Sequence, residues 1–122
     1  MVFRFTHKGD PIPFNRPRFK GKRGFNTPRY AAYKKAVVAS AMSAMFMADM
    51  SFPLIGPLKV YANFTRANRR AVDLDNLVKA ILDAMQDAGV YVNDHQVIRL
   101  YASKSVNKAT AGVSVIVREA GA

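Results

Sequence analysis

Two hydrophobic periodicities follow one another in the middle of the chain, and together they restrict the fold. Residues 58–66 (LKVYANFTR) alternate apolar and polar side chains, which is typical of a strand with one buried face. From Asp75 onward the apolar positions recur instead at helical spacing: Leu77, Ile81, Leu82 and Met85. Gly89 stands where a helix commonly ends. A strand and a helix that each bury one face predict a helix packed on a sheet.

The N-terminal third predicts a strand, an arm and a second helix. Residues 2–6 (VFRFT) alternate as a short strand does. The next 20 residues, about 9–28, hold three glycines and four prolines and predict a long loop or arm. Thr27 followed by Pro28 is a typical helix start, and the apolar spacing that follows predicts a helix to about Asp49.

The C-terminal third contains two β-rich runs, residues 96–106 and 112–119, which predict an antiparallel hairpin. We see no internal repeat and no interdomain linker. The chain of 122 residues is therefore expected to form one domain over residues 1–122, of the α+β or mixed α/β class. The expected order is β-arm-α-β-α-β-β, with about four strands in one mixed sheet and two helices.

Charge and composition indicate the kind of partner and exclude several classes of protein and of functional site. A formal charge of +11 and a pI near 10.4 favour a polyanionic partner, with nucleic acid ahead of an anionic membrane surface. The absence of cysteine excludes a disulfide scaffold, a thiolate nucleophile and a thiolate zinc site. No apolar run is long enough to span a bilayer, so we expect a soluble intracellular protein.

The few acidic residues are concentrated in one segment. Five of the eight lie between Asp73 and Asp94, where Lys79 is the only basic residue, so this segment carries −4 and the rest of the chain +15. A structural explanation is that one Asp caps a helix while Asp75, Lys79 and Asp83 form an exposed i, i+4 ladder. The other is a site for Mg²⁺ or Mn²⁺, because Asp73 and Asp75 at about 4 Å would repel by roughly 4 kcal/mol without a cation. Spacing alone leaves both open.

The arm is basic and aromatic. Between Pro11 and Ala48 there is no acidic residue, and basic side chains alternate with aromatic ones. Basic residues supply phosphate contacts and aromatics can stack on exposed bases, although Phe14 and Tyr30 would equally suit the core. The candidate nucleic-acid contacts are Arg16, Arg18, Lys20, Lys22 and Arg23 of the arm, with Arg69 and Arg70 before the acidic segment.

One ordered set of residues resembles the RusA-type Holliday junction resolvases. The motif starts with DLDN at Asp73, has a lysine three residues after Asn76, and ends in a G-x-x-x-x-D-x-x-V tail from Gly89. Chain length, basic charge and the arm sequence GDPIPFNRPR are also similar to that family. One difference is visible: two residues separate Arg69-Arg70 from the first aspartate, where members often place arginine directly.

The resemblance implies a metal-dependent endodeoxyribonuclease that resolves four-way DNA junctions by paired symmetric nicks in recombination and repair. It implies Mg²⁺, with Mn²⁺ as a substitute, and a homodimer acting on branched DNA in the cytoplasm of a bacterium, encoded by the bacterium or a phage. No membrane and no small-molecule substrate are expected. Asp73, Asp75 and Asp94 would be the metal-binding catalytic carboxylates, and Lys79 the catalytic lysine.

A non-catalytic basic nucleic-acid-binding module is the alternative, in which the acidic segment only offsets charge and caps a helix. A restriction-type nuclease needs an Asp/Glu-x-Lys triplet, and none occurs in the sequence. For the dimer, the helix around Val37 to Met50 carries more large apolar residues than one buried stripe needs: Met42, Met45, Phe46, Met47 and Met50. The same residues would otherwise belong to the core of the monomer.

Overall fold

The main sheet has four strands. The computed structural model describes residues 1–15, 18–20, 23–25 and 27–121. The strands of the sheet are β1 (Val2–Lys8), β4 (Leu58–Arg66), β5 (Val97–Val106) and β6 (Gly112–Glu119). Their spatial order is β1-β6-β4-β5, with β5 parallel to β4 and every other pair antiparallel, so the sheet is mixed as predicted.

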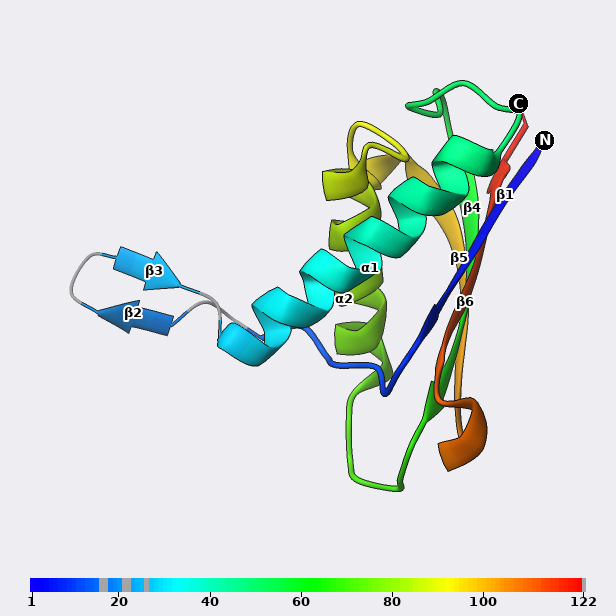
Figure 1. The fold of residues 1–122 in the computed structure, drawn as a ribbon. Helices are drawn as coiled ribbons and strands as arrows, with labels where there is room; N and C mark the ends of the chain where they lie inside the picture. Colours follow the sequence, from blue (N-terminus) through cyan, green and yellow to red (C-terminus); the bar gives the residue numbers. More distant parts are fainter. Residues whose placement is uncertain (16–17, 21–22, 26, 122) are drawn as a thin grey trace.

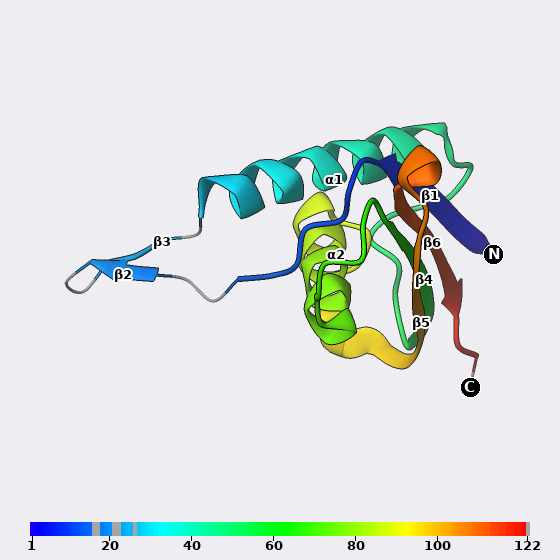
Figure 2. The same cartoon turned by 90° about the horizontal axis from the view of Figure 1, so that it is seen from below.

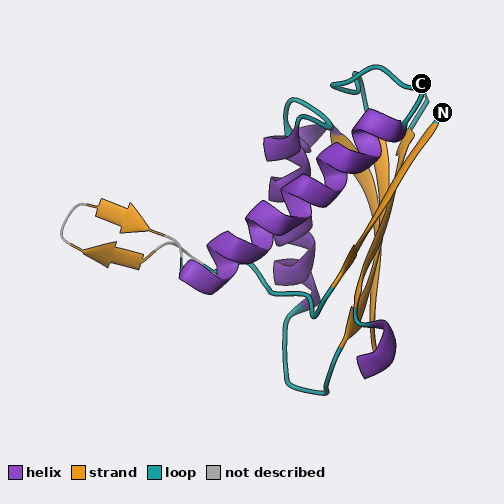
Figure 3. Ribbon diagram, viewed as in Figure 1, coloured by secondary structure: helices purple, strands orange, loops and turns teal. Residues whose placement is uncertain are grey.

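Two helices, α1 (Pro28–Met47) and α2 (Leu74–Ala88), cover one face of this sheet and cross each other (Figures 1 and 2). The two short 3₁₀ helices are η1 (Asp94–Gln96) and η2 (Lys108–Thr110). The predicted fold class of two helices on a four-stranded mixed sheet is confirmed (Figure 3). Within the described ranges, no helix combines the length and apolar character needed to cross a membrane.

The local signals at the helix ends act as the sequence predicts. The Thr27 hydroxyl accepts a hydrogen bond from the Tyr30 backbone N–H at 3.3 Å, and Pro28 occupies the first turn of α1. Gly89 ends α2 in the left-handed conformation with φ 87°, which glycine adopts without a Cβ penalty. Both helices therefore start or stop where a side-chain or glycine signal is present.

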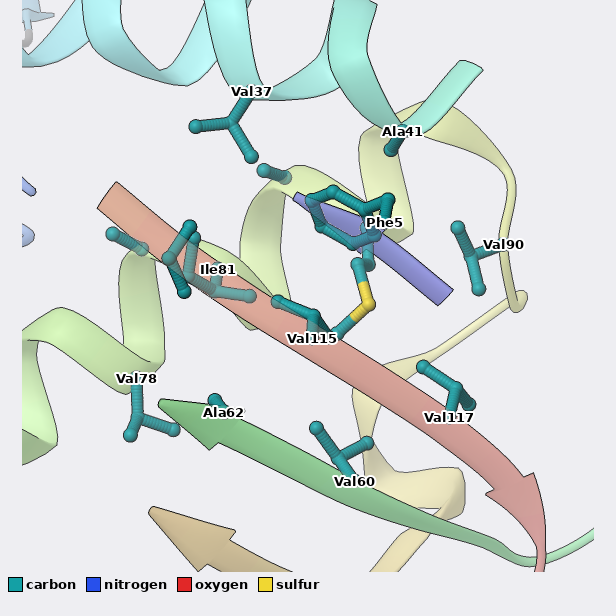
Figure 4. Packing of buried hydrophobic residues seen from close by; sticks show 14 of the residues in the cluster. Phe5, Val37, Ala41, Val60, Ala62, Val78, Ile81, Val90, Val115 and Val117 are labelled. Atoms are coloured by element: carbon teal, nitrogen blue, oxygen red, sulfur yellow. The ribbon is translucent and has the colours of Figure 1, made fainter. Parts of the chain in front are cut away.

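The core lies between the helices and the sheet. Alternate residues of β4, namely Leu58, Val60, Ala62 and Phe64, are at most 1% exposed and face the helices. Valines of β6 and the apolar stripe of α2 complete the layer, as the close view of Figure 4 shows for Val60, Val115 and Ile81. A strand buried on its helix face along its whole length belongs at the centre of the sheet.

That central position makes the predicted hairpin of the last two strands wrong. β5 and β6 are not neighbours, because β4 lies between them and bonds to both. The turn through η2 crosses the end of β4, where the Asn107 N–H donates to the Arg66 carbonyl at 2.9 Å. Placing β4 in the middle pairs both of its backbone edges, whereas the more exposed β5 takes the sheet edge.

The arm also contains structure that the sequence did not reveal. Within residues 9–28, β2 (Arg18–Lys20) pairs antiparallel with β3 (Arg23–Phe25). This small hairpin projects away from the two-layer body beyond the start of α1 (Figure 1).

Two buried tyrosines allow a matched test of this packing. Both phenols stay protonated, because burial raises the pKa of Tyr30 to about 12 and raises that of Tyr91 as well. The Tyr91 hydroxyl donates to the Leu82 carbonyl at 2.7 Å, whereas the Tyr30 hydroxyl is buried without a partner among the described residues.

We therefore expect Tyr91→Phe to lower the free energy of unfolding by about 1–2 kcal/mol, and Tyr30→Phe to leave it unchanged or raise it. Urea unfolding of both variants checks this. A larger loss for Tyr30→Phe than for Tyr91→Phe would contradict the hydrogen-bond assignment.

Candidate active site

The first turn of α2 presents two carboxylates. Asp73 is the N-cap residue, yet its side chain makes no capping hydrogen bond. Asp75 lies in the first turn, where one of its carboxylate oxygens accepts from the Asn76 N–H at 2.9 Å. Helix capping therefore does not account for the Asp73 carboxylate, which was the structural explanation open at the sequence level.

Lys79 lies one helical turn after Asp75. Its ammonium is 3.3 Å from an Asp83 carboxylate oxygen and 4.9 Å from the centre of the Phe14 ring. Phe14 is held there because its N–H donates to the Asn76 carbonyl at 2.9 Å. Of the predicted ladder, only the Lys79–Asp83 step is present among the structure's ion pairs between described residues. That pair is partly exposed and contributes little to stability.

Phe14 also packs edge-on against Tyr30, with ring centres 5.6 Å apart. These two aromatics thus take the packing role that the sequence left open. In addition, Phe14 places a ring beside the Lys79 ammonium, which it attracts through a cation–π contact.

Asp94 is held by the loop that leads from α2 into β5. The side-chain amide of Gln96 accepts from the N–H groups of Val92 and Asn93 and donates to the carbonyls of Leu54 and Gly56, at 3.0–3.2 Å. The Asp94 N–H in turn donates to the Gln86 side chain at 2.9 Å. This loop is therefore tied both to α2 and to the segment before β4.

α2, η1 and β5 enclose an open cavity of about 570 Å³. Its polar lining consists of Asp75, Lys79 and Asp94, and its walls are mostly apolar, including Leu82 and Leu100. The structure thus brings three of the four predicted catalytic side chains to one cavity. Asp73 lies at the cap of the same helix and does not line it.

Ion pairing separates the acidic segment into two groups. Asp83 pairs with Lys79, and Asp87 pairs with Lys34 at 2.9 Å. The three carboxylates of the predicted site form no ion pair among the described residues: Asp73, Asp75 and Asp94. These three aspartates are therefore the carboxylates of the acidic segment that are not already paired with a cation of the described chain.

The donor set fits a hard divalent cation. The acidic groups that line the cavity offer carboxylate oxygens, and neither histidine nor cysteine lines it. No three His, Cys, Asp or Glu side chains of the described residues lie close enough together to hold a metal by themselves. Mg²⁺ is commonly held by one or two carboxylates together with water and substrate phosphate, which matches Asp75 and Asp94.

A second pocket, of about 230 Å³, lies between the loop before α2 and the end of β5. It is lined by four basic residues and no acidic one: Arg66, Arg69, Arg70 and Lys104. The Lys104 ammonium donates to the carbonyl of Val72, the residue that precedes Asp73. A cation from β5 therefore lies next to the start of the acidic site.

Sequence reasoning missed Arg66 and Lys104. Arg66 is buried, bonds through its Nε to the Asp10 carboxylate at 3.1 Å, and leaves Nη1 without a partner among the described residues. The strand alternation in residues 97–106 could have placed Lys104 on the helix side of the sheet. It could not have shown that β5 lies beside β4, which brings Lys104 to the loop before α2.

The structure describes only some of the residues of the arm that were predicted to contact DNA. Arg16 and Lys22 lie outside the described residues. Arg18 and Lys20 lie in β2 and Arg23 lies in β3, where the structure describes the backbone and not the side chains. Their role stays a prediction, as does that of Arg69 and Arg70 in the basic pocket.

Comparison with known proteins gives a consistent family. The sequence model of the family described as "Endodeoxyribonuclease RusA" matches residues 8–118. The "Crossover junction endodeoxyribonuclease RusA" of Aquifex aeolicus (strain VF5) is 28% identical over 112 residues, which cover 88% of this chain and 84% of that protein. Both matches include the acidic segment, and the family model also covers the arm.

The four hydrogen bonds of the Gln96 amide generate a stability prediction. We expect Gln96→Ala to lower the free energy of unfolding by about 2–4 kcal/mol, because it removes the partner of two N–H groups in this loop and of two carbonyls in the segment before β4. Gln86→Ala is the control, since Gln86 is exposed and water can replace its one bond to Asp94. Equal losses in urea unfolding would contradict the anchoring role of Gln96.

Proposed function

Because this chain belongs to the RusA family of endodeoxyribonucleases and is a DNA-cleaving hydrolase, we propose that it resolves Holliday junctions by paired symmetric nicks. The proposal includes Mg²⁺ as the metal, with Mn²⁺ as a substitute, and a role in recombination and repair. Such a function belongs in the cytoplasm of a bacterium, for a protein of bacterial or phage origin. The family contradicts the alternative of a non-catalytic binding module.

One observation carries the proposal. Asp75, Lys79 and Asp94 come from α2 and η1 to line one cavity, and neither aspartate has an ion-pair partner among the described residues. Asp73 stands at the cap of α2 with its carboxylate unused by the helix. A binding surface for DNA alone gains nothing from carboxylates, because they repel phosphate.

The residues suit hydrolysis of a phosphodiester. A bound Mg²⁺ would supply an activated water and charge stabilisation at the phosphate. Asp75 and Asp94, with Asp73, would hold the cation and orient it. Lys79 would stabilise the charge that develops on the phosphate oxygens, and Phe14 and Asp83 hold its ammonium at the cavity.

The basic pocket would bind the neighbouring phosphates of the same strand. Arg69, Arg70 and Lys104 lie just before Asp73 in space or in sequence, and no acidic residue lines that pocket. A cluster of cations beside a carboxylate site offsets the repulsion between that site and the DNA backbone.

Cleavage and binding should separate in the aspartate variants. We expect Asp73→Asn, Asp75→Asn and Asp94→Asn each to reduce Mg²⁺-dependent cleavage of a synthetic four-way junction by about 100-fold or more. Junction affinity should stay equal or increase, because a negative charge near the phosphates is removed. Asp87→Asn is the matched control, since Asp87 lies on α2 but pairs with Lys34 away from the cavity.

Cleavage by gel assay and affinity by mobility shift, with matched linear duplex for comparison, provide the measurement. Loss of affinity in step with cleavage would point to a folding role for the aspartates. A native protein that cleaves linear duplex as well as the junction would contradict junction resolution.

A homodimer is part of the proposal. A four-way junction is approximately two-fold symmetric, and paired nicks need two sites in matching orientation, whereas this chain carries one copy of the carboxylate motif. α1 offers an apolar surface: Met42, Phe46 and Met47 are 54%, 89% and 80% exposed. Met45 and Met50, which the sequence grouped with them, pack instead against the core. An exposed patch of this kind favours association.

We expect Phe46→Glu, alone or with Met42→Glu, to convert a dimer to monomer in sedimentation equilibrium at micromolar concentration. A charge at the centre of an apolar contact is desolvated without a partner. Ile55→Glu is the control, because Ile55 is equally exposed, at 84%, but lies outside α1. A dimer that persists in both α1 variants would show that the interface lies elsewhere. A native protein that stays monomeric and nicks both strands would contradict the proposed dimer.

A further inference from the structure

The face of the sheet opposite α1 and α2 is not covered by either helix (Figures 2 and 3). Side chains alternate between the two faces of a strand. Val60 and Val117 are fully buried on the helix side, so their neighbours Lys59 and Arg118 project from the open side. Arg99 pairs with Lys59 and shares that side.

Three cations thus stand in register across three adjacent strands. Arg118 of β6 is directly opposite Lys59 of β4, and Lys59 is directly opposite Arg99 of β5. We call these three residues the cation row. Since neighbouring strands are about 4.8 Å apart, the row extends for about 10 Å across the sheet.

Like charges directly opposite each other destabilise a sheet, and no ion pair between described residues offsets this row. None of the three cations takes part in an ion pair or side-chain hydrogen bond among the described residues. The other outward positions of the four strands hold no acidic residue either. Two more bases, Arg4 and Lys8, project from β1 on the same side. Within residues 1–15, 18–20, 23–25 and 27–121, no ion pair gives this cationic face an internal counter-charge.

We propose that the cation row binds the phosphate backbone of a duplex arm of the DNA substrate. The inference rests on the proposed function for the identity of that DNA. Three successive phosphates of one strand cover about 7 Å of the helix axis, at about 3.4 Å per step, so a row of about 10 Å is long enough to contact all three. Phosphates between the three cations replace the repulsion along the row with attraction.

The edge strand connects this row to the active-site cavity. Leu100 and Ala102 of β5 line the cavity on the helix side, whereas Arg99 belongs to the row on the open side. β5 is the outermost strand next to β4, so DNA that passes its free edge meets the cavity first and the row next. The row therefore extends the contact surface of the site already described to the other side of the sheet.

The test replaces the row one residue at a time and together: Lys59→Gln, Arg99→Gln, Arg118→Gln and the triple variant. Affinity for a four-way junction is measured by fluorescence anisotropy between 50 and 200 mM NaCl without divalent metal. We expect the slope of log K against log salt to fall by about one unit per single change and about three for the triple variant. Lys35→Gln, an exposed lysine of α1, is the control and should keep the slope.

Thermal unfolding separates binding from folding. Lys59→Glu, which places an acid between two arginines, should raise the melting temperature and weaken junction binding by at least about tenfold at 100 mM salt, because it replaces one phosphate contact with a repulsion. A raised melting temperature with unchanged affinity would overturn the proposal, as would a triple variant whose slope equals that of Lys35→Gln. Row variants that bind vesicles of anionic lipid more weakly than the native protein does, but bind the junction equally well, would overturn it too.

The two proposals fail in different ways. Row variants should still cleave the junction when the protein is present above its weakened Kd, because no catalytic side chain is changed. If the row variants reduce the slope of log K against log salt as expected but the native protein does not cut the junction, junction resolution is wrong and the proposed role of the cation row stands. If the native protein cuts the junction and the row variants keep its slope of log K against log salt, the proposed role of the cation row is wrong and junction resolution stands.

Discussion

The phase of α2 on the sheet is the constraint on which the candidate site depends. Leu77, Ile81 and Met85 are at most 1% exposed, so rotation of the helix about its axis would bring apolar side chains into water. With that face buried, Asp75 and Lys79 at i and i+4 stay together on the side that lines the cavity. The loop after Gly89 then needs only the Gln96 bonds to bring Asp94 to the same opening.

Local signals in the sequence were sufficient to predict the two long helices, the four strands of the main sheet and part of the site, but not the hairpin of the arm. The alternation in residues 58–66 predicted the bounds of β4, and Thr27-Pro28 and Gly89 predicted helix ends that the structure confirms. Asp75, Lys79 and Asp94 were predicted from an ordered motif, and they line one cavity. Their catalytic and metal-binding roles stay predictions, because shared lining shows proximity and not chemistry.

Non-local pairing was beyond the sequence. The last two strands read as a hairpin because short connections commonly join neighbouring strands, yet β4 lies between them, where both of its backbone edges are paired. Three features follow from that topology: the reach of Lys104 to Val72, the basic pocket, and the opposition of Arg118, Lys59 and Arg99. The alternation of apolar and polar residues along a strand predicts which face of the sheet each side chain occupies. Only the order of the strands shows which charged residues lie opposite each other.

The segregation of charge has one physical explanation in the proposed function. A site built on Asp73, Asp75 and Asp94 repels the phosphates it must cleave, by roughly 4 kcal/mol per pair of charges at 4 Å and an effective dielectric near 20. Metal binding offsets that repulsion only locally, so the remaining attraction has to come from cations placed around the site. Basic side chains occupy the pocket before α2 and the open face of the sheet, and the predicted arm adds more. In the proposed function, the net charge of +15 outside the acidic segment would therefore hold a polyanion against a negatively charged centre.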